Sequence, residues 1–288
     1  HPVKILQFGE GNFLRAFWDK AVHELNVSGD FRGQICVVQP ISQGRLSDLA
    51  RQNYLYTVCL THSDGQDIQL VESLKSGVNP YEDYDAYLEL AADPNIRIVI
   101  SNTTEAGIVL DTDDALPNRP PRSFPGKLLA FLYERYQALG GHSGTGLLFF
   151  PSELIEDNGD TLREVLLRLA DSWDLSSGFM RWLETENTFY NTLVDCIVTG
   201  YPFDEADEYE KMLGYRDELL VKGESYQFLA IAGDRGYRDE FPIDASSLHV
   251  EWVDDLKKYR EIKVRILNGF QTMLAQCGFL AGLETVQE

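Results

Sequence analysis

The chain has 288 residues, of which 44% are hydrophobic, and a formal net charge of -21 at pH 7. This length and composition predict one large or two ordinary domains with a sizeable core. The negative charge disfavours nucleic acid and anionic membrane surfaces as partners, and an anionic substrate would need a locally positive pocket. We therefore expect a soluble cytoplasmic protein.

The cysteines and histidines indicate a reducing compartment and no metal site. Cys36 and Cys59 lie in apolar runs and are interpreted as buried free thiols. The 5 histidines show no short ligand spacing, and no apolar run is long enough to span a membrane. The chain starts at His1 and ends abruptly in the stretch 282–288, so we expect a fragment of a longer protein.

Residues 3–17 predict a strand, a glycine turn and a helix in that order. Residues 3–8 form an apolar run that is too short for a helix, and the glycine-containing turn 9–11 follows it. From Asn12 onward the apolar residues recur at helical spacing. This order is typical of the first βα unit of a dinucleotide-binding fold.

The glycines of this turn are suited to binding a pyrophosphate. Gly9 can take backbone angles that other residues avoid, and Gly11 has no side chain to keep a pyrophosphate from the backbone. The first helical amides and the positive end of the helix dipole then face the phosphates. Leu14 replaces the third glycine of G-x-G-x-x-G, so an ordinary strand-turn-helix corner remains the alternative. The predicted cofactor contacts here are Gly9, Gly11, Asn12 and Phe13.

The second predicted strand, over residues 34–38, bears on the choice of cofactor. An acidic residue usually follows this strand in NAD-binding folds and accepts hydrogen bonds from the ribose hydroxyls. Gln39 stands there instead, and it can bind a ribose but brings no charge to repel a 2′-phosphate. Arg45 is close enough in sequence to attract such a phosphate. On chemistry alone, NAD and NADP both remain open.

Residues 54–60 and 68–74 predict two strands of a hairpin around the turn 62–65. A helix over residues 81–92 then leads into a core strand over residues 96–100.

The core strand over residues 96–100 ends in small polar residues. Doubly wound sheets hold their ligands at the carboxyl ends of the central strands, so this segment is a candidate cofactor site. The alternative is a plain capped loop, in which Thr103 or Thr104 caps the next turn. The predicted cofactor contacts here are Asn102, Thr103 and Glu105.

A loop rich in Pro and Asp over residues 111–125 precedes a further series of helices and strands. The expected helices span residues 125–139, 162–173, 178–186, 204–211 and 258–280, and the expected strands span residues 147–150, 226–232 and 248–253.

Several motifs occur in an order that resembles the mannitol dehydrogenase family of polyol-specific long-chain dehydrogenases and reductases. They are FGEGNFLRAF, SNTTEAG, PSELIEDNG, TLVDCIVTGYP and KVRILNG, and the likeness runs from residue 3 to residue 288. The resemblance implies an α/β fold, with a Rossmann-type doubly wound sheet and extra strands over residues 1–256. It further implies that residues 257–288 are the truncated start of a mostly helical substrate domain.

The resemblance also implies an enzyme that transfers a hydride between a nicotinamide cofactor and a sugar acid, with a polyol as the alternative substrate. It favours NAD without excluding NADP. The family's catalytic helix carries a lysine, an asparagine and a histidine, and the matching positions here hold Lys263, Asn268 and Gln271. On an α-helix these positions fall within an arc of roughly 140°.

By this resemblance, Lys263 is the expected general acid/base, a role that requires burial or a nearby cation to favour the neutral amine. Asn268 is expected to donate to the substrate's carbonyl oxygen as charge develops there. Asn191 matches a second family position that contacts the same oxygen, and Gln271 is expected to contact substrate. Without the resemblance, Lys263 would be interpreted as a solvated surface lysine.

Three residues depart from the family pattern and leave the substrate open. Gln271 replaces a histidine and cannot hold a titratable proton. Cys196 replaces an arginine, and Ala232 replaces a polar or acidic residue. Each change removes a polar group near the expected substrate site, so a non-catalytic relative that binds a nucleotide or a sugar acid is the alternative hypothesis.

Overall fold

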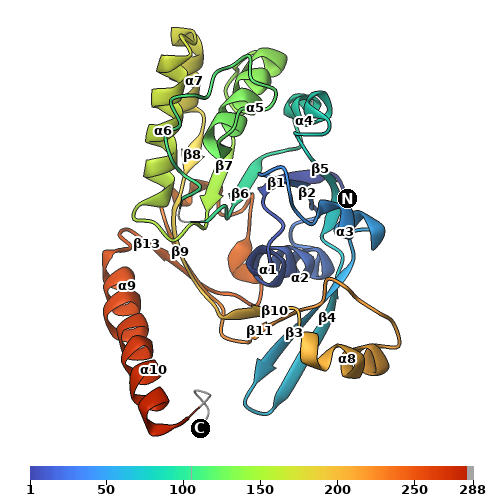
Figure 1. Ribbon diagram of the computed structural model, residues 1–288. Coiled ribbons are helices and arrows are strands. Elements are labelled where there is room, and N and C mark those ends of the chain that lie inside the picture. Colours follow the sequence, from blue (N-terminus) through green and yellow to red (C-terminus); the bar gives the residue numbers. More distant parts are fainter. Residues whose placement is uncertain (105, 284–288) are drawn as a thin grey trace.

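The computed structural model describes residues 1–104 and 106–283. Its centre is a parallel six-stranded sheet with the strand order β5-β2-β1-β6-β7-β8 (Figure 1). Since the strand order reverses at β1, the sheet is doubly wound, and the predicted α/β class is confirmed. The strands are β1 (Val3–Phe8), β2 (Gln34–Val38), β5 (Leu74–Val78), β6 (Ile98–Ser101), β7 (Leu148–Pro151) and β8 (Thr188–Phe189).

Alternating side chains of β1 enter two separate hydrophobic cores. Ile5 packs on one face with the amino-terminal helical segment, whereas Leu6 and Phe8 pack on the other face. The first face is covered by α1 (Asn12–Leu14), the π-helical η1 (Arg15–Asp19) and α2 (Lys20–Ser28). The opposite face is covered by α4 (Tyr84–Glu89), α5 (Phe124–Leu139), α6 (Asn158–Ser172) and α7 (Ser177–Thr185) (Figure 1).

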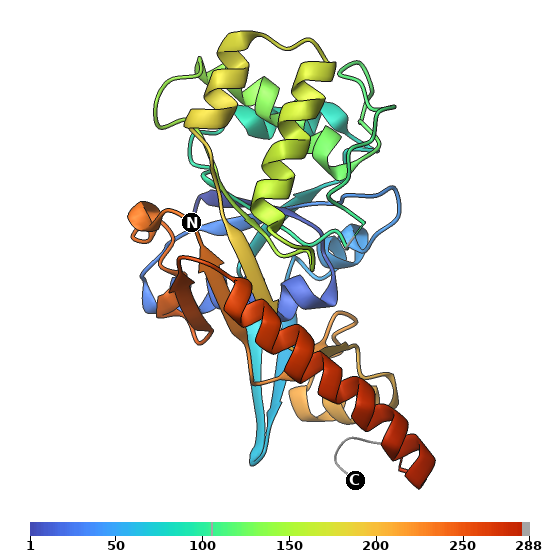
Figure 2. The ribbon, with the colours of Figure 1, turned by 90° about the vertical axis from the view of Figure 1, so that its left-hand side faces the viewer.

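Two smaller sheets extend the first core. One has the order β10-β11-β3-β4, and its hairpin of β3 and β4 projects from the body of the molecule (Figure 2). The other has the order β13-β12-β9 and packs close to α6. The strands are β3 (Tyr56–His62), β4 (Gly65–Val71), β9 (Asn191–Asp195), β10 (Val198–Gly200), β11 (Val221–Glu224), β12 (Phe228–Ala232) and β13 (His249–Val253).

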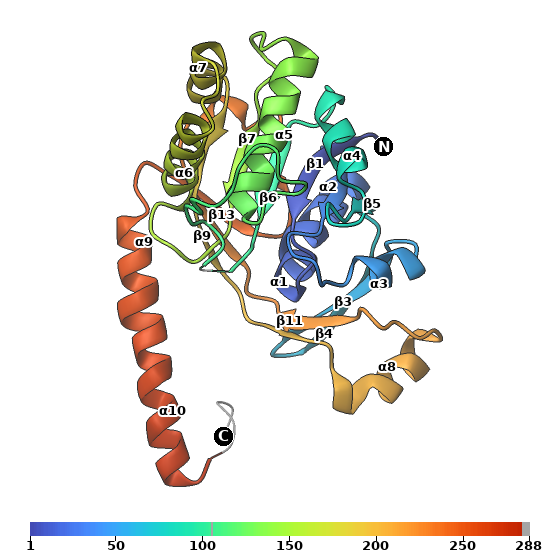
Figure 3. The same ribbon diagram turned by 45° about the horizontal axis from the view of Figure 1, so that its top comes forward.

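Short helices connect these layers, and one long helical segment closes the described chain. The short ones are α3 (Leu46–Arg51), η2 (Leu90–Ala92), η3 (Phe203–Glu205), α8 (Ala206–Leu213), η4 (Arg235–Tyr237) and η5 (Ile243–Ala245). The long segment comprises α9 (Lys257–Glu261), the π-helical η6 (Ile262–Asn268) and α10 (Gly269–Ala281), and it runs away from the parallel sheet (Figures 1 and 3).

The structure differs from the sequence-based expectation around the hairpin. The second hairpin strand ends at Val71, and a separate strand, β5, begins at Leu74 and becomes the edge of the parallel sheet. Only Leu74 and Val78 of this strand are large apolar residues, so it carries no periodic signal. The strands β10 and β11 were not expected for the same reason, since they are short and each contains a glycine.

A fully buried carboxyl group, Asp19, lies where η1 meets β1 and β3. The Tyr56 hydroxyl donates to Asp19 Oδ2 at 2.9 Å, and the Ser73 hydroxyl donates to the Asp19 carbonyl at 2.7 Å. Asp19 Oδ1 and Gln7 Oε1 are buried, and neither has a hydrogen-bond partner among the described residues. Burial raises the pKa of Asp19 to about 7, although the hydrogen bond from Tyr56 and the nearby Arg15 cation act in the opposite direction. A proton on Asp19 would remove the cost of a buried charge at this position.

Protonation of Asp19 should therefore couple folding to pH. Its pKa rises from an ordinary 3.8 to about 7 in the folded chain. The folded chain then binds the proton more tightly than the unfolded chain, and this stabilisation is full below pH 4 and disappears as the pH rises through 7. We expect the free energy of unfolding of the wild type, relative to Asp19→Asn, to fall by up to about 4 kcal/mol across this window.

Urea unfolding at a series of pH values measures this difference directly. Asp64→Asn, in the exposed turn of the hairpin, is the matched control and should follow the wild-type profile. Parallel profiles for the wild type and Asp19→Asn would show that Asp19 is not protonated in the fold.

Candidate active site

The turn between β1 and α1 has two glycines with different structural requirements. Gly9 has φ +119°, and a Cβ there would lie 2.8 Å from Leu14 Cδ1 and 3.1 Å from the Asn102 carbonyl oxygen. A side chain is therefore excluded both by backbone conformation and by contact. Gly11 is exposed, has φ -66°, and a Cβ there would have no neighbour within 4 Å. Position 11 thus borders open space at the start of the helical segment 12–28, as a pyrophosphate site requires.

The missing third glycine of the fingerprint has a physical explanation. Leu14 is only 1% exposed, and its Cδ1 occupies the space beside Gly9. The helix therefore packs on the strand end through the Leu14 side chain, which lies against Gly9, and needs no third glycine.

A second site borders the carboxyl ends of β2 and β5. A cavity of about 400 Å³ is lined there by Gln39, Gly44, Tyr54, Asn79 and Glu82, among others. Gln39 is 4% exposed, and its Nε2 donates to the Ile41 carbonyl at 3.0 Å. This is the place at which the adenosine ribose lies in doubly wound dinucleotide-binding folds.

The guanidinium of Arg45 is engaged outside this cavity. Its Nε donates to Asp48 at 2.9 Å, and one of its terminal nitrogens donates to the Glu218 carbonyl at 3.0 Å. The Arg45 backbone amide donates to Glu10 Oε1 at 3.0 Å. Burial raises the pKa of Glu10, against the hydrogen bond from Arg45. The glycine turn is thereby fastened to the loop that follows β2.

The segment after β6 is held by one buried carboxyl group. Glu153 is 2% exposed and accepts hydrogen bonds from Ser101 Oγ at 3.0 Å, the Thr103 amide at 2.9 Å and Thr103 Oγ1 at 2.8 Å. Burial raises the pKa of Glu153, and the hydrogen bonds from Thr103 and Ser101 act against it. Asn102 Nδ2 donates to the Ser152 carbonyl at 3.1 Å. Glu105, the remaining candidate of this segment, lies outside the described residues.

Two adjoining cavities join this segment to the carboxyl-terminal helix. They hold about 210 Å³ and 190 Å³, and both are lined by Glu153, Leu154, Val194 and Lys263. Phe13 and Asn102 complete the first cavity on the side of the glycine turn. Asn268 and Arg260 line the second. The structure therefore brings two of the predicted cofactor contacts, Phe13 and Asn102, and two of the predicted catalytic residues, Lys263 and Asn268, to one cleft.

Lys263 is anchored over β9. Its Nζ donates to the Val194 carbonyl and lies 3.3 Å from Asp195 Oδ1, and its side chain is 15% exposed. Lys263 is thus mostly buried, unlike the solvated surface lysine that would be inferred without the family resemblance, and its ionic partner is a carboxylate.

The π-helical geometry of η6 corrects the expected arrangement of the helix. Lys263 and Asn268 are five residues apart and both fall within η6. A π-helix closes its hydrogen bonds from i to i+5, so residues five apart lie closer together around the axis than they do in an α-helix. An α-helix would have separated them widely around the axis. This local change of pitch explains why both side chains line the same cavity.

Two other candidates lie outside the cleft in this structure. Asn191 Nδ2 donates to Asp160 Oδ2 at 2.8 Å, and its Oδ1 accepts from the Asp160 amide at 3.0 Å, beside the start of α6. Gln271 is exposed on α10, beyond Asn268. Neither residue lines the two cavities, so their contact with substrate stays a prediction.

Cys196 and Ala232 also have defined positions. Cys196 lines the first cavity, and burial raises the pKa of its thiol to about 11, so it is not a thiolate at neutral pH. Ala232 is 9% exposed and pairs with Asn191 in the register between β12 and β9.

Sequence reasoning assigned no role to Glu153, Asp195 or Arg260. Glu153 follows β7 just as Ser101 ends β6, and this repeated position at a strand end is the signal that could have identified it. The contact between Asp195 and Lys263 joins residues that are far apart in the sequence, so no local pattern reveals it.

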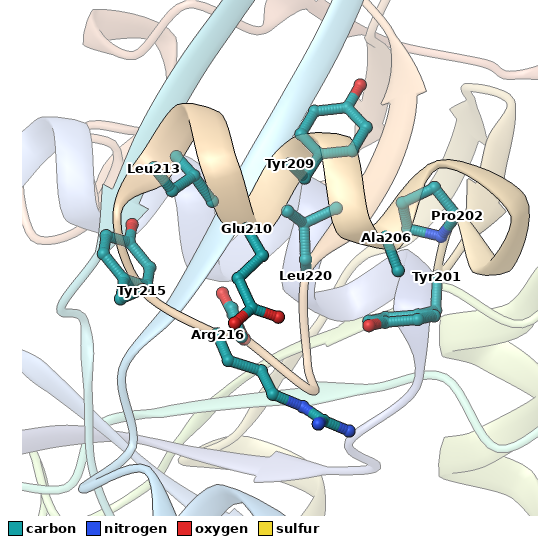
Figure 4. Close-up of a pocket in the computed structure, with 10 residues that line it drawn as sticks. Tyr201, Pro202, Ala206, Tyr209, Glu210, Leu213, Tyr215, Arg216 and Leu220 are labelled. Carbon is teal, nitrogen blue, oxygen red and sulfur yellow. The ribbon is translucent and has the colours of Figure 1, made fainter.

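A further pocket lies under α8 and holds only about 10 Å³, room for roughly one water. Figure 4 shows that Tyr209, Leu213 and Leu220 line it, with Glu210 and Arg216 at its edge. It is too small for a nucleotide or a sugar.

Two negative findings apply to residues 1–104 and 106–283. Within these ranges, no helix combines the length and apolar character that crossing a membrane requires. The same residues contain no group of His, Cys, Asp and Glu side chains that could hold a metal ion.

Comparison with known proteins identifies the family. The family described as "Mannitol dehydrogenase Rossmann domain" matches residues 3–267. The chain belongs to the mannitol dehydrogenase family. Relatives of this family member include the altronate oxidoreductase of Bacillus subtilis (strain 168), which is 47% identical over 100% of this chain and 61% of its own length. The altronate oxidoreductase of Halalkalibacterium halodurans is 42% identical over 100% of this chain and 57% of its own length.

Solved structures of the family share the fold. A D-sorbitol dehydrogenase in substrate-free form superposes with a TM-score of 0.81 at 24% identity, over 98% of this chain and 60% of that one. A Pseudomonas fluorescens mannitol 2-dehydrogenase, in ternary complex with NAD and D-mannitol, gives a TM-score of 0.79 at 24% identity, over 98% and 59%. The chain thus spans about 60% of the length of these relatives.

The two glycines of the turn predict opposite effects of substitution. Gly11→Val should leave the fold intact, because a side chain there meets open space, but it should weaken nucleotide binding at least about tenfold by filling the pyrophosphate site. Gly9→Ala should instead lower the melting temperature, since its Cβ would overlap Leu14. Fluorescence titration with NADH and thermal melting check both. Unchanged NADH affinity in folded Gly11→Val would mean that the turn binds no pyrophosphate.

Proposed function

We propose that this chain forms the cofactor-binding and catalytic part of a cytoplasmic oxidoreductase that transfers a hydride between NAD and a sugar acid, reducing tagaturonate to altronate. The relatives named altronate oxidoreductase, at 42% and 47% identity over the whole chain, support this substrate. The observation that carries the proposal is the cleft whose adjoining cavities are lined by Lys263 and Asn268 on one side and by Asn102 and Phe13 on the other.

The residues present fit a dinucleotide. Open space at Gly11 suits the pyrophosphate, and the cavity at Gln39 suits the adenosine ribose. Asn102 and Thr103 would hold the nicotinamide end at the carboxyl end of β6. When bound, the nicotinamide supplies or accepts the hydride.

Lys263 moves the proton that accompanies the hydride. Reduction of a ketone places negative charge on its oxygen, and the Lys263 ammonium donates a proton to that oxygen. Two of its three N–H groups face partners among the described residues, Val194 and Asp195, and the third is left for substrate. The Asn268 amide donates to the same oxygen and stabilises the charge as it develops. In the reverse direction the neutral amine takes the proton of the alcohol.

NAD is the cofactor that the ribose site favours. The cavity is lined by the carboxyl group of Glu82 and by no lysine or arginine among the described residues. Arg45 could attract the 2′-phosphate of NADP, but its guanidinium donates to Asp48 and to the Glu218 carbonyl. A 2′-phosphate would therefore meet a carboxylate and no cation that is free to bind it.

The segment from residue 257 onward is proposed to begin a second, helical domain. The described residues of α9, η6 and α10 include none that is buried. Even the large apolar side chains of Val264, Ile266 and Phe270 are 53%, 65% and 55% exposed. A stretch of exposed apolar side chains of this length is typical of an interface.

The departures at Gln271 and Cys196 favour the non-catalytic alternative, a relative that binds the same ligands without turnover. Retention of Lys263 and Asn268 in one cavity argues for the enzyme. Assay of the full-length protein with a panel of sugar acids and polyols separates the two hypotheses.

The first prediction from this proposal concerns Lys263. In the full-length protein, Lys263→Ala should reduce turnover of tagaturonate at least about 100-fold and change NADH affinity only a few-fold, because the residue moves a proton and does not hold the cofactor. Lys257→Ala, an exposed lysine on the same helical segment, is the matched control and should keep wild-type turnover. Near wild-type turnover in Lys263→Ala would exclude the acid/base role.

The second prediction concerns cofactor choice. NADH should bind more tightly than NADPH, and Gln39→Asp should widen the difference by repelling the 2′-phosphate. Arg45→Gln should change the ratio little, because the guanidinium is already engaged. Dissociation constants from fluorescence titration decide this, and tighter binding of NADPH by the wild type would overturn the assignment.

A further inference from the structure

Arg260 is a second cation on the substrate side of the cleft. It lies near the end of α9, one helical turn before Lys263, and lines the 190 Å³ cavity together with Lys263 and Asn268. Its side chain is 20% exposed, and it donates to Glu156 Oε1 at 2.7 Å and lies 3.5 Å from Asp157 Oδ1. The cavity is thus lined by two cations in a chain whose net charge is -21.

The ion pairs of the two cations differ in how deeply they are buried. The pair between Lys263 and Asp195 is largely buried, with 15% and 19% of the side chains exposed. In contrast, the partners of Arg260 are 77% and 57% exposed. Ion pairs with an exposed partner contribute little, because water competes for both groups. A ligand carboxylate can therefore replace Glu156 on Arg260 at little cost.

The remaining carboxyl group of this cavity does not compete for Arg260. Glu153 accepts hydrogen bonds from Ser101 and Thr103 on the far side of the cleft. Arg260 is consequently the cation in this cavity, among the described residues, that is available for an anionic group. A guanidinium binds a carboxylate through two parallel hydrogen bonds, which fixes both position and orientation.

We propose that Arg260 binds the carboxylate of the sugar-acid substrate and makes the site select acids over neutral sugars. This inference rests on the proposed function. Lys263 meets the carbonyl oxygen at one end of the open chain, and Arg260 meets the carboxylate at the other. Both side chains line the cavity of about 190 Å³, so one uronate bound there can contact both. When no substrate is bound, the Arg260 guanidinium donates to the Glu156 carboxylate.

The test compares an acid and a neutral substrate in the full-length protein. Arg260→Gln should raise the KM for tagaturonate at least about tenfold, the loss expected for one charge-assisted contact, with kcat within a few-fold of wild type. The same variant should leave kcat/KM for tagatose, the neutral ketose, unchanged or higher. Where tagatose turns over too slowly, its inhibition constant against tagaturonate gives the same comparison.

Three further variants make the result specific. Arg260→Lys should bind tagaturonate more tightly than Arg260→Gln but less tightly than the wild type. It keeps the positive charge but cannot form the two parallel hydrogen bonds of a guanidinium. Glu156→Gln should keep or lower the KM, since it removes the competing carboxylate. Arg265→Gln, on the same helix with its side chain 76% exposed, should behave as the wild type.

Each outcome decides the matter. An unchanged KM for tagaturonate in Arg260→Gln overturns the inference. Equal losses for tagaturonate and tagatose, or a raised KM in Glu156→Gln, also overturn it, since they would show that the ion pair only fastens α9 to its neighbouring loop. A wild-type protein that turns over no sugar acid would instead remove the proposed function itself, and the inference with it.

Discussion

The buried carboxyl group of Glu153 connects the parts of the candidate site. It accepts three hydrogen bonds from Ser101 and Thr103, and so joins the carboxyl ends of β6 and β7. The same residue lines both cavities of the cleft. Burial of a carboxyl group is costly unless hydrogen bonds compensate it, so the segment that follows β6 is held in one conformation. The position of Asn102 at the cofactor side depends on this contact.

The opposite wall of the cleft is built from a different sheet. The strand β9 presents the Val194 carbonyl and the Asp195 carboxylate to Lys263, and this anchors the last helical segment. The π-helical turn then places Asn268 beside Lys263. The parallel sheet therefore positions the proposed cofactor side, and the small sheet containing β9 positions Lys263, the proposed proton donor.

Much of the parallel sheet could be predicted from the sequence because its strands are buried on both faces. Residues 34–38 and 147–150 are apolar runs, and they appear as β2 and β7 within one residue of the expected bounds. The strands β5, β10 and β11 could not be predicted, since pairing with neighbours stabilises them and their own residues carry little apolar pattern. The same limit applies to the π-helical turn, which changes the geometry of Lys263 and Asn268 without a signal in sequence spacing.

Parts of the candidate site could be predicted from the sequence where the local backbone conformation requires one particular residue type. Gly9 is such a case, because its backbone angle and its contacts with Leu14 and Asn102 both require glycine. Roles that arise from tertiary contact, such as that of Asp195, follow only from the fold. Asn191 is hydrogen-bonded to Asp160 in this structure, and its contact with the carbonyl oxygen, which the resemblance implies, stays a prediction.

Hydride transfer to the ketone of a sugar acid in this cleft is tested most directly with the full-length protein, tagaturonate, and NADH that carries deuterium at the transferring position of the nicotinamide ring. We expect deuterium on the newly formed carbinol carbon of altronate, as seen by NMR, with none lost to water. Binding of the labelled NADH without transfer of deuterium to any sugar acid or polyol would contradict it.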